Sequence, residues 1–336
     1  MARQPAACHV LSTLLRRHFL AALATLPLCS LEREAGAAAA GPRLKALTRD
    51  TLGVTLTLGL PDAPFAGIGY GDDTVIVFVP THFRFRADEG VCALVHFHGH
   101  NTAAERAMMG HALREQLVDS RQNALLIVPQ LAVFAADSSC GRLESPGGLA
   151  RLLADALRAT SRFGRASLGE AGFPERAHLG RVCLSAHSGG YHAAARSLHD
   201  GGVDVHETYL FDALYAESDV FREWMVARRG KPAQLRHKLV SYFTEGATTE
   251  AVNQVLRTEL ERAGVLVAEE QREGELSRHD LSHAEAVFVR TSIGHSNVTW
   301  ETNALRDVLY ASTLPRHLTA SWFENGTGAR PIDRRR

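Results

Sequence analysis

The hydrophobic positions of the chain fall into short apolar runs separated by amphipathic stretches. Apolar runs of strand length cover residues 74–80, 91–97, 124–129, 182–184, 207–211, 238–243 and 286–290. Residues 51–60 instead alternate between apolar and polar positions, which is typical of a half-buried strand. Unbroken apolar runs are typical of strands covered on both faces, as in a parallel sheet.

Helical patterns lie between these runs. They cover residues 102–119, 147–159, 191–198, 220–229, 249–263 and 300–310. The second of these places its leucines on one face, and Thr249 is predicted to be the N-cap of the helix over 249–263. The alternation of strand and helix predicts a doubly wound, mostly parallel sheet flanked by helices.

Two predicted segments flank a single predicted domain over residues 41–320. Residues 1–40 resemble a twin-arginine export signal, because Arg16 and Arg17 precede an apolar stretch that runs to about Leu31. Small residues at 35–40 suit cleavage. This predicts a periplasmic or secreted protein, and the apolar stretch is too short to span a membrane.

The charged residues at 32–34 leave another interpretation of the N-terminus open. It is either a basic segment without a targeting role or the product of a wrongly assigned start codon. At the other end, residues 321–336 are polar and are predicted to be a disordered tail.

Composition excludes several classes of protein. Lys+Arg and Asp+Glu both number 37, so the chain has no excess of positive charge. A nucleic-acid partner is therefore not predicted. Outside the predicted signal remain Cys92, Cys140 and Cys183, an odd number that is not a disulfide framework. Cys92 and Cys183 lie in apolar runs and are expected to be buried thiols. The sequence contains no closely spaced pair of cysteines, so it does not predict a cysteine-based metal site.

Reactive side chains follow the apolar runs directly. In a doubly wound sheet, ligands bind beyond the carboxyl ends of the strands. The residues at those ends are His98-Gly99-His100-Asn101 after 91–97, Ser188 after the run at 182–184, Asp212 after 207–211, Glu245 after 238–243, and Gly294-His295 after 286–290. Asp280 and His283 precede the last run and are expected at the opposite end of the sheet.

The stretch from Arg181 to Tyr191 has the pattern of a nucleophile elbow, in which a strand, a tight glycine turn and a helix place a serine at the corner. The sharp turn exposes the oxygen of Ser188. The helix N-terminus places an N–H group beside the atom that will carry negative charge. The usual pattern is Gly-x-Ser-x-Gly, so Ala186 is a departure from it at the first position.

The Ala186–Gly190 elbow, the His96–Asn101 stretch and Gly294-His295 make the chain resemble the α/β-hydrolase superfamily over roughly residues 45–312. No particular subfamily is indicated. The resemblance implies an α/β-hydrolase fold and a triad in which Ser188 is the nucleophile and His295 the general base.

Two carboxylates remain open as the acid of this triad. Asp212 is favoured because its neighbours Phe211 and 213–215 are expected to bury it, and a buried carboxylate orients an imidazole. Glu245 is the alternative, since it follows the strand after which the acid more commonly lies in this superfamily.

The predicted oxyanion hole uses the backbone N–H groups of Gly189 and His100, with His98 and Gly99 supporting the loop. The alternation of His96, His98 and His100 raises the alternative of a metal site, because alternate strand residues point to one face. No acidic residue lies among them, so we predict no metal and no cofactor. The loop at 131–146 is expected to wall the pocket, and the segment 213–230 with Trp224 to form a small lid.

These residues together predict an exported serine hydrolase that cleaves an ester through an acyl-enzyme, acting on a small-molecule or acyl substrate. The same residues also suit an amidase or peptidase. A non-catalytic binding protein on the same fold is the third alternative, because fold does not determine function.

Overall fold

A ten-stranded sheet forms the centre of the computed structural model, which describes residues 41–67, 71–135 and 138–317. The predicted export signal at 1–40 and the predicted tail at 321–336 lie outside the described residues. The strands are β1 (Arg43–Arg49), β2 (Gly53–Gly59), β3 (Thr74–Pro80), β4 (Val91–Phe97), β5 (Ala124–Pro129), β6 (Leu179–His187), β7 (Val205–Phe211), β8 (Lys238–Thr244), β9 (Val267–Glu270) and β10 (Ala286–Thr291).

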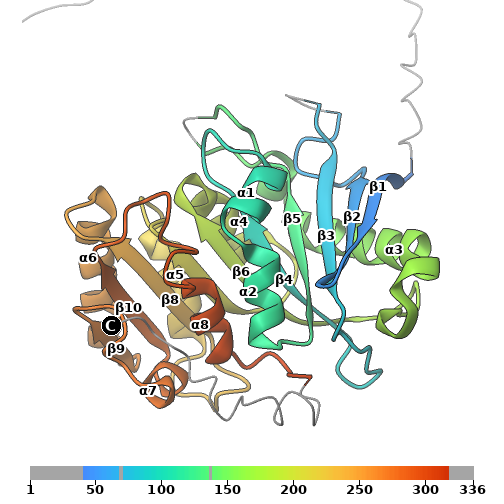
Figure 1. Cartoon of the computed structure of the whole chain (residues 1–336). Helices are drawn as coiled ribbons and strands as arrows, with labels where there is room; N and C mark the ends of the chain where they lie inside the picture. The colour runs from blue at the N-terminus through green and yellow to red at the C-terminus, as the bar shows by residue number, and fades with distance from the viewer. Residues whose placement is uncertain (1–40, 68–70, 136–137, 318–336) are drawn as a thin grey trace, which may run out of the picture. The chain divides into compact units, whose positions relative to one another are not determined.

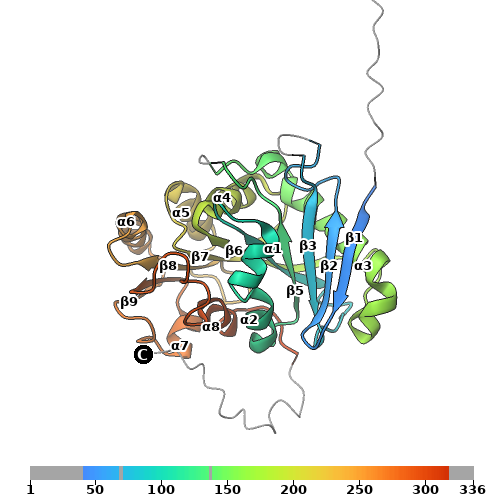
Figure 2. The ribbon, with the colours of Figure 1, turned by 45° about the horizontal axis from the view of Figure 1, so that its top comes forward.

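The strands lie in the order β1-β2-β3-β5-β4-β6-β7-β8-β10-β9. From β5 to β9 in this order, all neighbours pair in parallel, whereas β1, β2, β3 and β5 pair antiparallel with one another. Figure 2 shows β1, β2 and β3 side by side at one edge. The mostly parallel, doubly wound sheet predicted from the sequence is therefore confirmed.

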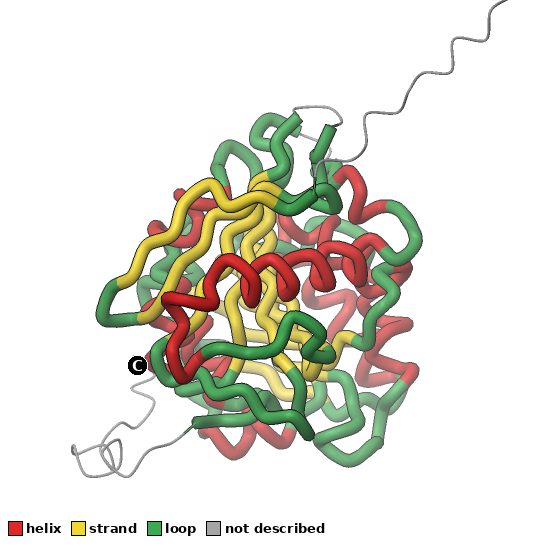
Figure 3. The backbone as a smooth tube through the Cα atoms, turned by 90° about the vertical axis from the view of Figure 1, so that its right-hand side faces the viewer, coloured by secondary structure: helices red, strands yellow, loops and turns green. Residues whose placement is uncertain are grey.

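Helices cover both faces of the sheet (Figure 1, Figure 3). They are α1 (Ala104–Gly110), α2 (Leu113–Ser120), α3 (Gly148–Leu168), α4 (Tyr191–Asp200), α5 (Ser218–Ala227), α6 (Thr248–Arg262), α7 (Arg278–His283) and α8 (Ala304–Tyr310), with short 3₁₀ turns η1 (Gly141–Glu144), η2 (Gly169–Ala171) and η3 (Ser188–Gly190). Helices α3 to α6 bury their apolar residues in one core cluster and α1, α2, α7 and α8 in another. No helix of the described residues is long and apolar enough to cross a membrane.

The helix predicted over 102–119 is two helices in the structure. Ala112 interrupts it with a backbone φ of 48°, in the left-handed region that a regular helix excludes. The side chain of Gln116 donates to the carbonyl oxygen of His111 at 2.8 Å and so satisfies an acceptor at the break. The apolar periodicity continues through the break, which is why the sequence did not indicate it.

Other boundaries also differ from the prediction. The last helix begins at Ala304 rather than at residue 300, because Asn303 adopts a φ of 58°. Helix α3 extends past the predicted end at 159 to Leu168. The sequence did not predict β1, β9 or α7, because β1 and β9 are polar edge strands and α7 is a six-residue helix.

The strand register brings the reactive loops to one edge of the sheet. Phe97 at the end of β4 pairs with Ala186 on β6, and His187 pairs with Phe211 at the end of β7. The next residues along the chain, His98, Ser188 and Asp212, therefore leave the sheet at the same level. Helix α7 instead precedes β10, so Asp280 lies away from this edge and forms a capping box with Ser277.

We expect Gly190→Ala to lower the free energy of unfolding by about 3 kcal/mol, the cost of overpacking a tight contact. Gly190 has a φ of −64°, which alanine adopts readily, so the cost is steric. An added Cβ would lie 2.3 Å from the backbone oxygen of Phe97. Urea denaturation measures the change.

Gly110→Ala is the matched control, because apart from the adjacent residues and the backbone of its own helix, nothing lies within 4 Å of the added Cβ. Its stability should stay the same or rise by up to about 1 kcal/mol. Equal stability of the two variants would contradict the close approach at Gly190.

Candidate active site

Ser188 lies at the sharp turn between β6 and α4, with a φ of 53°. Non-glycine residues rarely adopt this left-handed conformation, and the strain is a feature of nucleophile elbows. Gly190 allows the start of the helix to approach β4. Ala186, the departure from the usual elbow pattern, is fully buried and pairs with Phe97 on β4, so the sheet accommodates its methyl group.

His295 lies on the loop after β10, between Ser188 and Asp212. Its Nε2 is 2.9 Å from Ser188 Oγ, and its Nδ1 is 2.7 Å from Asp212 Oδ2. Because an ionised carboxylate only accepts hydrogen bonds, Nδ1 carries the proton and donates to Asp212. Nε2 is then free to accept the hydrogen bond of the Ser188 hydroxyl. The structure thus brings these three predicted residues together in one chain of hydrogen bonds.

Asp212 is buried and yet held in its charged form. Burial alone raises the pKa of this carboxyl, but hydrogen bonds from His295 and Thr249 outweigh burial and hold the pKa below its usual value. The hydroxyl of Thr249 donates to Oδ1. The N-cap of α6 is Ala247, so the prediction of Thr249 as a cap is wrong, and its hydroxyl supports the carboxylate instead.

Glu245, the alternative acid, lies elsewhere. Its side chain is half exposed and forms an ion pair with Arg290 at 2.8 Å. The backbone N–H of Glu245 donates to the carbonyl of Thr291, which fixes it to β10. The structure therefore brings Asp212, and not Glu245, to the imidazole of His295.

The loop after β4 lies against the elbow. An added Cβ at Gly99 would lie 2.6 Å from Ser188 Cβ, and one at Gly189 would lie 3.4 Å from the backbone nitrogen of His100. The backbone of Gly189 and the N–H of His100 are therefore neighbours beside the serine. Two oxyanion-hole donors must lie close together beside the nucleophile, and these two backbone segments do so.

His98 fastens this loop to the end of β5. Its Nε2 accepts the backbone N–H of Leu131 at 2.8 Å, and its Nδ1 donates to the carbonyl oxygen of Gly99 at 2.9 Å. His96 hydrogen-bonds through Nδ1 to Ser185 Oγ at 2.6 Å. Within the described ranges, no group of metal-binding side chains contains the histidines of this stretch.

His187 is a site residue that the sequence did not single out. Its Nε2 donates to the carbonyl oxygen of His295 at 2.8 Å, which anchors the loop that carries the imidazole. Burial lowers the pKa of His187 to about 3, so the ring stays neutral. Tyr215 was expected only to help bury Asp212, and it also lies near the imidazole, with its ring centre 6.4 Å from that of His295. In the sequence, only the position of His187 directly before Ser188 could have indicated that it belongs to the site.

The structure agrees with the predicted pocket wall at 131–146 near Ser138 but not with Trp224 as part of a lid. Ser138 of the loop at 131–146 lies beside the elbow, since its Oγ would be 2.9 Å from a Cβ at Gly189. Trp224 of the predicted lid stacks on His237 with ring centres 4.3 Å apart. His237 directly precedes β8, so Trp224 lies toward the end of the sheet opposite the site, and the lid prediction is wrong for this residue.

The mostly parallel sheet, the elbow and the chain order Ser188, Asp212, His295 match the arrangement that the resemblance to α/β-hydrolases predicts. No protein-family model matches the chain, and no curated protein sequence matches it.

The three free cysteines of the described residues, Cys92, Cys140 and Cys183, are buried. This confirms the expectation that Cys92 and Cys183 are buried thiols.

Several solved structures are similar to this chain at low identity. An S-formylglutathione hydrolase from Staphylococcus aureus is 12% identical with a TM-score of 0.43, covering 80% of this chain and 96% of its own. An S-formylglutathione hydrolase from Agrobacterium tumefaciens is 10% identical with a TM-score of 0.43, covering 81% and 100%. A ferulic acid esterase is 9% identical with a TM-score of 0.45, covering 82% and 100%.

We expect Thr249→Val to lower the free energy of unfolding by roughly 1.5–3 kcal/mol at pH 7, because it removes a hydrogen bond to a buried charge. The pKa of Asp212 is lowered in the folded protein, so its contribution is complete above the unfolded pKa of about 3.9 and is lost as the pH falls through the folded value. The difference from wild type should therefore shrink below about pH 4.

Thr248→Val is the control, since Thr248 is the exposed neighbour on the same helix. It should change stability by less than about 0.5 kcal/mol. A loss in Thr249→Val that is the same at pH 7 and pH 3 would show that the hydroxyl does not support the charge of Asp212.

Proposed function

We propose that the protein is a serine hydrolase that cleaves carboxylic esters through an acyl-enzyme. The observation that carries the proposal is the hydrogen-bonded chain from Ser188 through His295 to Asp212, at 2.9 Å and 2.7 Å, with the serine on a strained turn. An ordinary serine at a helix start has no imidazole in this position and no strained backbone.

In this mechanism His295 Nε2 takes the proton of Ser188 as the serine oxygen attacks the substrate carbonyl. The buried carboxylate of Asp212 stabilises the imidazolium that forms. The N–H groups of Gly189 and His100 donate to the oxyanion. His295 then gives its proton to the leaving alcohol, which leaves the acyl group on Ser188. A water molecule, deprotonated by His295, attacks this acyl-enzyme, releases the acid and regenerates the serine.

We propose further that the protein is exported, on the basis of the twin arginines and the apolar stretch at residues 1–40. The substrate would then be a small-molecule or acyl ester met outside the cytoplasm. The roles of Ser188, His295 and the oxyanion-hole groups do not depend on this second proposal.

The reaction class is tested by the hydrolysis of p-nitrophenyl esters and p-nitroanilides of varied chain length. Wild type should cleave the esters. Ser188→Ala should lower kcat by about 10⁶-fold, and Asp212→Asn by about 10⁴-fold because the imidazole loses its orienting carboxylate. Glu245→Gln, the control, should keep kcat within a few-fold.

Faster cleavage of the anilides would make the protein an amidase, and inactivity of wild type on every substrate would favour a binding protein. Loss of activity in Glu245→Gln alone would overturn the assignment of Asp212. Each of these results contradicts a different part of the proposal.

Export is tested by replacing Arg16 and Arg17 together with lysine in a bacterial host that has the twin-arginine system. The exported fraction should fall sharply, because the transport machinery recognises the arginine pair. Immunoblots of periplasmic and cytoplasmic fractions measure it. An unchanged periplasmic fraction would contradict a twin-arginine signal, whereas ester hydrolysis by the purified protein would be unaffected.

A further inference from the structure

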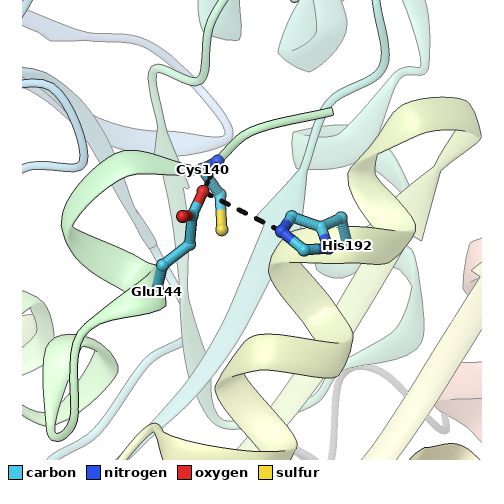
Figure 4. Close-up of side chains that lie close together, drawn as sticks. All are labelled: Cys140, Glu144 and His192. Atoms are coloured by element: carbon cyan, nitrogen blue, oxygen red, sulfur yellow. Dashed lines mark hydrogen bonds and ion pairs between the residues drawn. The ribbon is translucent and has the colours of Figure 1, made fainter. Parts of the chain in front are cut away.

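Three side chains of different chemistry lie close together beside α4, the helix that follows the elbow. Cys140 and Glu144 belong to the loop around η1, and His192 is the second residue of α4 (Figure 4). The thiol sulfur, a carboxylate oxygen and a ring nitrogen all lie within 4.8 Å of one another. Nε2 of His192 and Oε1 of Glu144 are 3.8 Å apart.

The spacing of these atoms suits a tetrahedral metal ion. Zinc binds thiolate, imidazole and carboxylate ligands at about 2.0–2.3 Å, so its ligand atoms lie roughly 3.3–3.8 Å from one another. Nε2 of His192 and Oε1 of Glu144, at 3.8 Å, lie within about 0.5 Å of this separation. All three ligand atoms lie within 4.8 Å of one another, so the remaining pairs need to approach by at most about 1.5 Å.

His192 has the second hydrogen bond that metal-binding histidines require. Its Nδ1 lies 3.1 Å from Oε1 and 3.0 Å from Oε2 of Glu217. A carboxylate accepts, so Nδ1 carries the proton and the lone pair of Nε2 points at Glu144 and Cys140. A carboxylate behind the imidazole orients the ring and raises its basicity toward a metal.

Charge balance also favours a divalent cation. Cys140 is fully buried, and the carboxylate of Glu144 and the imidazole of His192 lie beside its sulfur. A thiolate and a carboxylate neutralise one divalent ion. Arg196 on α4 is paired with Asp200 at 2.9 Å and also donates to the backbone carbonyl oxygen of Glu144 at 3.4 Å.

We propose that Cys140, Glu144 and His192 bind one zinc ion, with Glu217 orienting the histidine and a water molecule as the fourth ligand. On binding, the S–H bond of Cys140 breaks, its proton passes to solvent and a sulfur–zinc bond forms, with no change of oxidation state. The sulfur and nitrogen donors exclude calcium and magnesium, which take sets of oxygen ligands.

The site would join the pocket wall to the helix that carries the nucleophile. Ser138, which lies beside Gly189, precedes Cys140 by two residues on the same loop. His192 follows Ser188 by four residues. A bound ion would therefore fix the loop next to the proposed oxyanion hole, without touching the reacting atoms.

The test uses the full chain, freed of metal by chelation and titrated with Co²⁺. Wild type should take up one Co²⁺ per chain, with the visible bands of a tetrahedral ion and a near-ultraviolet band from thiolate ligation. Zn²⁺ should displace it. Cys140→Ser should abolish the thiolate band, and Glu217→Gln should weaken Zn²⁺ binding by roughly 10–100-fold, as removal of an orienting carboxylate does.

His192→Ala should weaken binding more than Glu217→Gln does, because it removes a ligand. His199→Ala is the control, since His199 is exposed on the same helix and pairs with Asp200. It should bind as wild type does. Circular dichroism of each variant checks that it is folded.

Failure of wild type to show the thiolate band would overturn the proposal, as would an unchanged band in Cys140→Ser. The wild-type spectrum alone is decisive even if a variant does not fold. The four side chains would then be a hydrogen-bonded ion-pair cluster that packs the loop onto α4. Ester hydrolysis by Ser188 does not depend on either outcome.

Discussion

The site depends on a close approach between the backbone after β4 and the start of the helix after β6. Gly190 lies against the carbonyl of Phe97, and Gly99 lies against the side chain of Ser188. A Cβ at either glycine would meet these atoms at 2.3 Å and 2.6 Å, well inside van der Waals contact. The two glycines thus allow a strained serine and the N–H groups of two loops to share one small space.

Hydrogen bonds around Asp212 and His295 then depend on one another. Burial of the carboxylate opposes its charge, and the donors from His295 and Thr249 offset that cost. The loop that carries His295 is itself held by the N–H of the neutral His187. Because each member needs the others, loss of one partner is expected to weaken the whole network rather than a single contact.

Much of this arrangement could be predicted from the sequence. Unbroken apolar runs indicated the central strands, and the rule that ligands bind at their carboxyl ends selected Ser188, Asp212 and His295 as neighbours. The order of these residues along the chain, serine then acid then histidine, indicated their roles in a triad. The choice between Asp212 and Glu245 required the structure, because both follow strands and only the strand positions and loop paths decide which one reaches the imidazole.

The supporting contacts could not be predicted, because they join distant residues without a motif. Thr249 and Asp212 are 37 positions apart, and His187 and His295 are 108 apart. The cluster of Cys140, Glu144 and His192 was missed for the same reason, since a single cysteine in a loop has no recognisable spacing to a histidine on the elbow helix. Edge strand β9 and the break at Ala112 were missed because polar edges and left-handed residues leave the apolar pattern unchanged.

An activated Ser188 nucleophile should react covalently with a phosphonylating reagent. The full chain is incubated with a fluorophosphonate, digested and mapped by mass spectrometry. One adduct is expected, on the oxygen of Ser188, and none in Ser188→Ala. An unlabelled wild type, or an adduct on a different residue, would contradict this expectation.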